Sequence, residues 1–349
     1  LYGIFSKMVT SIREEAFSPC IAYTGTRPVE YAAVPLTMYG SGADHLESYT
    51  SMSALLEHFY AEKNTLTRIR QKSSDLRRIV QTALERDIKK YDLQLAQMKD
   101  TEKREKYRIY GELLNTYGYS AKPGDKSLTA VNYYTSEPVT IPLDPTLSAT
   151  ENAKKYFDKY GKLKRTYEAL SELTCQVKEE IDHLETISTA LDIALKEEDL
   201  VEIKEELTQS GYIRRKGGTK KAKITSRPFH YLSSDGFHIY VGKNNFQNDE
   251  LTFKFANGND WWFHAKGIPG SHVVVKTEGK ELPDRTFEEA GRLAAYYSKG
   301  REQEKVEIDY VQKKQVKKPA GAKPGFVVYY TNYSLMIDSD ISGIEKISD

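Results

Sequence analysis

The chain has 349 residues, 39% of them hydrophobic, which is enough for two or three domains with apolar cores. Lys and Arg total 51 and Asp and Glu total 50, but the counts from residue 212 onward are 23 and 17, which leaves 28 and 33 before it. Two cysteines exclude a disulfide framework, and no run approaches the ~18 apolar residues of a membrane span. We therefore expect a cytoplasmic protein whose C-terminal part, with a net charge of +6 against −5 for the rest, binds a polyanion.

Residues 1–48 are predicted to be the end of a larger preceding region, because the chain starts at Leu1 without an initiator Met. Strand-like runs at residues 19–23 and 29–36 flank a turn at residues 25–28. Two strands are a poor fold alone. We expect them either to pack on the base of the helices that follow or to have lost their natural partner.

Two long amphipathic segments, residues 49–110 and 148–210, carry apolar side chains at alternating steps of three and four. A repeat of 3.5 residues faces a partner helix rather than a globular core, so the two segments predict an antiparallel coiled-coil arm. At ~1.5 Å per residue, ~45 helical residues would extend roughly 65 Å. Such an arm is a spacer rather than a catalytic scaffold.

Between the helices, residues 111–147 contain Gly and Pro turn signals and are predicted to form a small tip insert with a hairpin at residues 131–134 and 139–141. The insert is rich in tyrosine. These rings form either a contact surface, since Tyr is enriched at interfaces, or a small core that caps the arm.

The remaining chain is predicted to be a basic linker, residues 211–226, which includes Arg214 and Arg215, and a domain at residues 227–349. A helix is expected from a capping box at Thr286 to Gly300. Strand-like runs surround it at residues 237–241, 251–255, 261–264, 273–276, 306–311, 326–331 and 333–337. The fold class is therefore α+β, a long arm followed by a compact α+β domain.

Two stretches of this domain carry polar residues that could contact RNA. Lys243, Asn244 and Asn245 follow a strand, where such side chains bind phosphate, sugar or base edges or form ordinary turns. In residues 260–272, alternation places one tryptophan on each face of a strand, so at most one is needed in the core and the other could stack on a base. The candidates here are Trp262, His264, Lys266, Ser271 and His272.

A third stretch, residues 313–326, holds five lysines on a loop rich in Pro and Gly. No acid lies between Asp309 and Asp338, so the loop is either a phosphate-binding surface or a solvated charged loop. The lysines are Lys313, Lys314, Lys317, Lys318 and Lys323. A metal-dependent enzyme that uses His264, His272 and Asp260 is a further hypothesis, but no HxH, HExxH, Walker or nucleophile-elbow pattern is present, so we predict no enzyme activity, metal or cofactor.

Four motifs in order carry a family resemblance: residues 243–249, 260–265, 269–274 and 318–325. Together they resemble the NFACT-R module of the NFACT family, which includes the bacterial RqcH proteins, eukaryotic NEMF and the FbpA-type proteins named for fibronectin or fibrinogen binding. The arm with an inserted tip matches the same family. By this resemblance, residues 1–48 are the trailing edge of the NFACT-N and helix-hairpin-helix half.

The resemblance implies a ribosome-associated quality-control factor. Such a factor binds the large ribosomal subunit that carries a stalled peptidyl-tRNA, and it recruits alanine-charged tRNA so that alanines added to the nascent chain mark it for degradation. The arm would span the subunit with its tip toward the stalk base, and the ribosome would perform the bond chemistry. The alternative is a surface adhesin that binds fibronectin or fibrinogen, which a cytosol-like cysteine count and the lack of tandem repeats do not favour.

Overall fold

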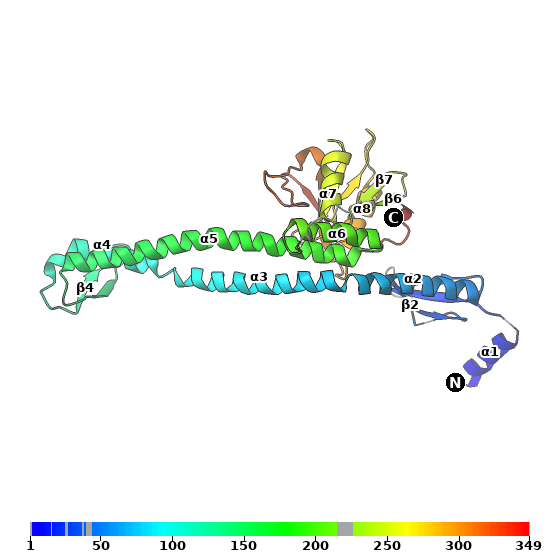
Figure 1. The fold of residues 1–349 in the computed structure, drawn as a ribbon, viewed down its shortest axis with the longest axis horizontal. Helices are drawn as coiled ribbons and strands as arrows, with labels where there is room; N and C mark the ends of the chain where they lie inside the picture. The colour runs from blue at the N-terminus through cyan, green and yellow to red at the C-terminus, as the bar shows by residue number, and fades with distance from the viewer. Residues whose placement is uncertain are drawn as a thin grey trace. The chain divides into compact units, whose positions relative to one another are not determined.

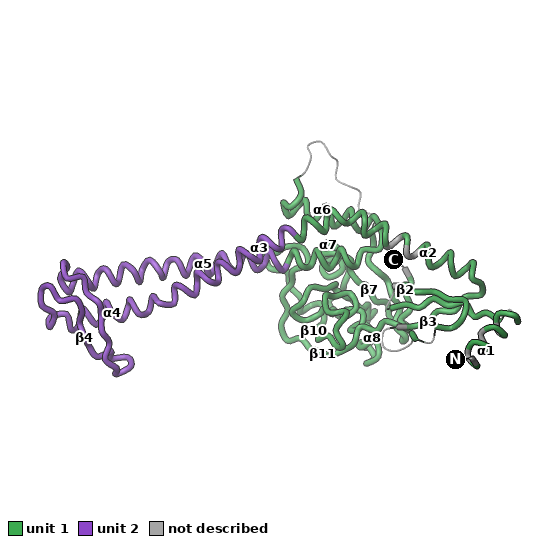
Figure 2. Tube along the Cα trace, turned by 90° about the horizontal axis from the view of Figure 1, so that it is seen from below, with its two compact units in different colours: residues 1–81, 183–349 green, residues 82–182 purple. Residues whose placement is uncertain are grey.

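The computed structural model describes residues 2–14, 16–24, 27–36, 38–39, 44–214 and 226–348. The chain divides into two compact units, which are coloured separately in Figure 2. Unit 1 contains residues 1–81 and 183–349, and unit 2 contains residues 82–182. Helix and sheet are both present, with the long helices in the first two thirds of the chain and the largest sheet in the C-terminal part.

Unit 2 is built from two long helices that lie side by side, α3 (Ser74–Asp100) and α5 (Ala149–Ile193), the ends of which continue into unit 1 (Figure 1). Buried positions of α5 within the unit recur at steps of four and three, at Leu170, Thr174 and Val177. The Thr174 hydroxyl donates a hydrogen bond to the Met98 sulfur, at 3.5 Å. The apolar stripe read from the sequence therefore faces the neighbouring helix.

The tip of unit 2 has its own small core. It contains α4 (Arg104–Tyr117), η1 (Gly118–Ser120), β4 (Ser127–Val131) and β5 (Pro138–Pro142). Leu113 and Ile141 are fully buried, and the Tyr156 hydroxyl donates to the Pro142 carbonyl at 2.6 Å. The predicted small core is present and includes Tyr110, whereas Tyr119, Tyr133 and Tyr134 are exposed, and their role as a contact surface stays a prediction.

Each predicted long helix is divided in the structure. The first consists of α2 (Met52–Lys72), α3 and α4, and the second of α5 and α6 (Glu197–Gln209). The second break follows from Asp199, whose carboxylate accepts the backbone N–H groups of Leu195 and Lys196 and so begins a new helix.

In unit 1 the N-terminal segment contains α1 (Tyr2–Arg13) and a three-stranded antiparallel sheet of β1 (Cys20–Thr24), β2 (Arg27–Ala32) and β3 (Asp44–Ser48), in the order β2-β1-β3. Ile21 and Tyr23 pack against Leu55 and Phe59 of α2. The predicted strands therefore pack on α2, at the base of the helical segment. The third strand, β3, was not predicted from the sequence.

The C-terminal part of unit 1 is a seven-stranded antiparallel sheet of order β11-β10-β8-β9-β7-β6-β12. Helix α8 (Asp284–Tyr296) covers one face, where Phe229, Phe263 and Ile308 are buried. The other face holds Trp262 and Val274. The strands are β6 (Phe229–Leu232), β7 (His238–Val241), β8 (Trp261–Ala265), β9 (Val273–Val275), β10 (Val306–Gln312), β11 (Tyr333–Ile337) and β12 (Glu345–Ser348).

Three local predictions for this domain are wrong. The expected strand 251–255 is instead a π-helical turn, η2 (Leu251–Phe255), that continues α7 (Asn245–Glu250). The expected strand 326–331 makes a single bridge, between Lys317 and Val328. Helix α8 begins after Pro283 rather than at Thr286, and the expected capping box is absent from this described segment. The Thr286 hydroxyl donates a hydrogen bond to Asp235 instead, and the Glu289 carboxylate accepts the Ser234 backbone N–H.

Candidate nucleic-acid interface

Lys243, predicted to bind phosphate, is buried. Its side chain is 2% exposed, and its Nζ lies 3.2 Å from Asp199 Oδ1 of α6 and 4.5 Å from the centre of the Phe229 ring. Asp199 Oδ1 also accepts the hydroxyl of Ser226 at 2.6 Å. The ammonium group is therefore neutralised inside the protein.

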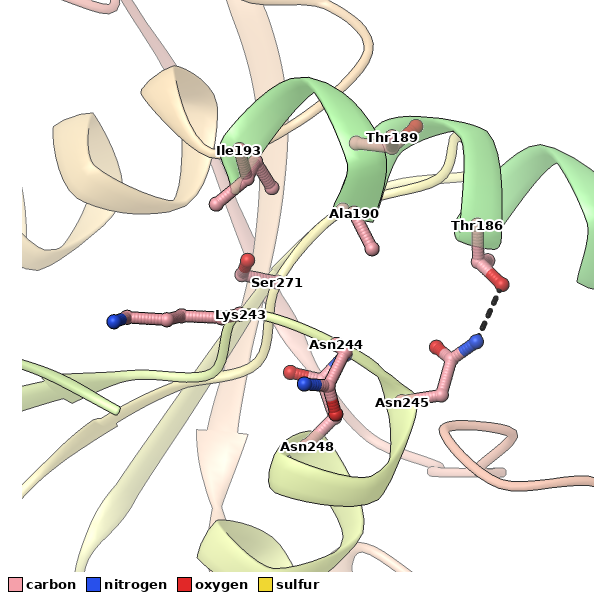
Figure 3. Close-up of a pocket in the computed structure, with 10 residues that line it drawn as sticks. Thr186, Thr189, Ala190, Ile193, Lys243, Asn244, Asn245, Asn248 and Ser271 are labelled. Carbon is pink, nitrogen blue, oxygen red and sulfur yellow. Dashed lines mark hydrogen bonds between the residues drawn. The ribbon is translucent and has the colours of Figure 1, made fainter. Parts of the chain in front are cut away.

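The neighbouring amides also bind carboxylates of α6. Asn244 Nδ2 and Gln247 Nε2 both donate to Glu202 Oε2, at 2.7 and 2.8 Å. Asn245 Nδ2 donates to Glu206 Oε1 at 2.7 Å and to the Thr186 hydroxyl, a bond drawn in Figure 3. We call residues 243–249 the amide segment, and the structure corrects the expectation that its Lys243, Asn244 and Asn245 form an exposed RNA face.

Glu206 occupies an unfavourable position for a charged group. Burial raises its pKa to about 8 and also raises the pKa of Glu202, while burial lowers the pKa of His183 to about 4. Glu206 Oε1 and His183 Nε2 are 3.7 Å apart, but at neutral pH both groups are largely uncharged and form no ion pair. Among the described residues, Glu206 Oε2 has no hydrogen-bond partner.

Trp262 is likewise in the interior. It is 0% exposed and its ring contacts those of His264, His272 and Tyr329, with centroids 5.0 to 5.6 Å apart. The alternation in β8 is as expected, but both faces of the sheet are covered, and Trp261 packs on Phe287 of α8. The prediction of Trp262 as an exposed stacking ring is therefore wrong.

The other candidates near β8 have structural contacts. Ser271 and His272 are buried, and burial lowers the pKa of His272 well below its usual value and also lowers that of His264. Lys266 is exposed, with its Nζ 2.6 Å from Glu307 Oε1. Asp260 accepts bonds from Lys276 Nζ and the Thr277 backbone N–H. Within the described ranges, no three His, Cys, Asp or Glu side chains converge to hold an ion.

The lysine loop, which we define as residues 313–330, is the predicted stretch that keeps several cations at the surface. Lys314, Lys317 and Lys318 are exposed, and Lys313 and Lys323 are half-buried. Lys318 pairs with Asp249, whereas Lys314 and Lys317 have no ion pair within the part of the chain that the structure describes. Arg214 is also exposed, and Arg215 lies outside the described residues.

The amide segment holds this loop in place. The Gly325 N–H donates to Asp249 Oδ1 at 3.1 Å, and Gly325 has a φ of +79° that favours glycine. A Cβ on Gly325 would lie 2.3 Å from Asn245 Oδ1. The polar motif that the sequence suggested as an RNA contact is therefore a support for the loop that carries the lysines.

The acidic face of α6 was missed by the sequence reading. Its members, Asp199, Glu202 and Glu206, recur at steps of three and four, which is a detectable helical pattern. The pattern alone did not show that their partners lie some forty residues further along the chain.

Comparison with known proteins gives the family. Residues 1–226 match the model for NFACT N-terminal and middle domains, and residues 227–330 match the NFACT protein RNA binding domain. The chain belongs to the NFACT family, and its C-terminal domain is the RNA-binding type.

Relatives that match most of the chain are bacterial proteins named Rqc2 homolog RqcH. The chain is 41% identical over 308 residues to the Rqc2 homolog RqcH of Streptococcus suis, covering 88% of the chain and 55% of the relative. It is 34% identical over 345 residues to RqcH of Bacillus subtilis, covering 97% and 59%. The chain thus spans a little over half the length of these relatives.

A solved structure is also similar. The C-terminal part of the fibronectin/fibrinogen-binding protein of Streptococcus suis aligns with a TM-score of 0.64 at 36% identity, covering 80% of this chain and 99% of that one. None of the described helices combines the length and apolar character needed to cross a membrane.

Proposed function

We propose that this chain is part of a cytoplasmic ribosome-associated quality-control factor that contacts RNA through the lysine loop. The observation that carries the proposal is the exposure of Lys314 and Lys317, without ion pairs among the described residues, on a domain of the NFACT RNA-binding family. Cations on a surface with few opposing carboxylates bind the phosphate backbone with salt-dependent affinity.

The partners we propose are the large ribosomal subunit, the stalled peptidyl-tRNA on it and alanine-charged tRNA. Relatives named Rqc2 homolog RqcH support this assignment. In this scheme the paired helices of unit 2 act as a coiled-coil arm that spans the subunit, and the chain supports alanine tailing without catalysing it. The ribosome performs the bond chemistry.

Replacing Lys314 and Lys317 with Ala tests the proposal. Binding of the full chain to large subunits or tRNA should fall roughly tenfold or more between 50 and 200 mM salt, and the double variant should lower the slope of log affinity against log salt by roughly 1.4 to 1.8. Filter binding over a salt series measures both. Lys305→Ala is the matched control. Lys305 is exposed and directly precedes β10, whereas the lysine loop directly follows it, and a strand of seven residues separates the two by roughly 23 Å. Salt-insensitive binding, or equal losses in the control, would contradict the proposal.

A second candidate is binding of fibronectin or fibrinogen, which the name of the similar Streptococcus suis protein favours. Surface labelling of intact cells separates the two functions. A quality-control factor stays unlabelled until the cells are lysed, whereas an adhesin is labelled on intact cells.

A further inference from the structure

Two aromatic side chains of the lysine loop point outward. Val327 and Tyr329 pack into the core beside Trp262, so alternation along this extended segment directs Phe326 and Tyr330 to solvent. Phe326 is 50% exposed and Tyr330 is 66% exposed. The domain thus buries the Trp262 ring, leaves Trp261 half-buried against α8, and exposes the rings of Phe326 and Tyr330.

The exposed rings lie on the same side of the loop as Lys317, which has no ion pair among the described residues. The backbone N–H groups of Lys317 and Val328 donate to each other's carbonyl at 2.9 Å. Directly opposite residues of an antiparallel pair point to the same side, so Lys317 shares the outer side with Val328 and, by alternation, with Phe326 and Tyr330.

Carboxylates near these rings are already engaged. Asp249 pairs with Lys318 and accepts the Gly325 N–H, and Asp309 is buried and accepts the hydroxyls of Tyr329 and Ser334. The outer side of the loop therefore combines positive charge with aromatic surface.

The loop holds both rings on a fixed backbone. Tyr329 is anchored by its 2.8 Å bond to Asp309, and Gly325 is anchored by Asp249. Each exposed ring is next to one of these anchors, so little additional ordering is needed when a ligand binds.

We propose that Phe326 and Tyr330 are stacking platforms for unpaired bases, and that Lys314 and Lys317 bind the adjoining phosphates. This deepens the proposed function and rests on it, because it specifies single-stranded RNA, or the unpaired loops and ends of folded RNA, as the ligand. Four residues of extended chain place the two rings roughly 13 Å apart, so each ring takes its own base rather than sharing one. A duplex offers no free base face, so it engages the lysines alone.

Fluorescence anisotropy with the full chain tests this inference. The probes are a 12-nucleotide oligouridine and a 12-base-pair RNA duplex. Phe326→Ala and Tyr330→Ala should each weaken binding of the single strand roughly 5- to 150-fold and leave duplex binding within about 2-fold. Neither should change the salt slope, whereas Lys317→Ala should lower the slope for the single strand by roughly 0.7.

Tyr333→Ala is the matched aromatic control. Tyr333 is 61% exposed but stacks on Tyr310 in the layer of the sheet that α8 covers, so its loss should leave both affinities unchanged. Phe326→Trp and Tyr330→Trp keep a ring and should retain single-strand binding, which separates stacking from loop unfolding.

Three results would overturn the inference. If the lysine variants weaken RNA binding while the aromatic variants do not, the stacking role is wrong and the proposed function stands. If the aromatic variants weaken duplex and single strand equally, the preference for unpaired bases is wrong. If the unmodified chain binds neither probe at low salt, the proposed RNA-binding function fails as well.

Discussion

Replacing Lys243 with Met should lower the free energy of unfolding of the C-terminal domain by about 3–5 kcal/mol. The ammonium group is buried with Asp199, and its removal leaves that carboxylate without its cation in a low-dielectric interior. A lysine that only bound RNA would be dispensable for stability, with a change within about 0.5 kcal/mol.

Urea unfolding followed by tryptophan fluorescence measures this effect, because the chain has two tryptophans and both lie in β8. The exposed Lys305→Met serves as the control in the same domain. Combining Lys243→Met with Asp199→Asn should recover part of the loss, since the double variant no longer buries an uncompensated charge. If the Lys243→Met variant is as stable as the original chain but loses RNA affinity, Lys243 is an RNA contact, as the sequence predicted.

The free energy of unfolding of unit 1 should fall as the pH rises, because of Glu206 on α6. Its pKa is about 8 in the folded protein against an ordinary value of 4.5, so folding favours the protonated carboxyl. The stability from this group is fully present below pH 4.5 and is lost as the pH rises to about 8, at a limiting slope of about 1.4 kcal/mol per pH unit. Glu206→Gln stays neutral and removes this dependence.

The same fluorescence unfolding experiment, repeated from pH 5 to pH 9, gives the slope for each variant. Glu198→Gln changes an exposed carboxylate of α6 and should leave the profile unchanged. The free energies of unfolding of the original chain and of Glu206→Gln could instead run parallel across this range of pH. In that case the Glu206 carboxyl is ionised in the folded state, and its burial against Asn245 is wrong.

The spacing and type of neighbouring side chains were sufficient to predict helices and strands that have a clear apolar face. The apolar stripe at Leu170, Thr174 and Val177 predicted a helix that faces another helix, and the aromatic run at residues 261–264 predicted β8. Residues 251–255 alternate apolar and polar side chains like a strand, but they follow α7, whose N-cap Asn244 accepts the Gln247 N–H, so the chain continues in a helical turn.

The functional surface was harder to predict because burial depends on distant parts of the chain. Lys243, Asn244 and Asn245 are polar and follow a strand, and only the position of α6 reveals that they are covered. Trp262 is covered by Tyr329 of the lysine loop itself. The lysines were identified from their charge alone, whereas Phe326 and Tyr330 needed the inward contacts of Val327 and Tyr329 to show that they face outward.

The most direct test of the account is ultraviolet cross-linking of the chain to large ribosomal subunits, with the cross-linked peptides identified by mass spectrometry. The account predicts RNA adducts on the lysine loop, centred on Phe326, Tyr330 and the lysines beside them, and none at residues 243–247. Adducts centred on the amide segment or on Trp262, with the lysine loop unmodified, would contradict it.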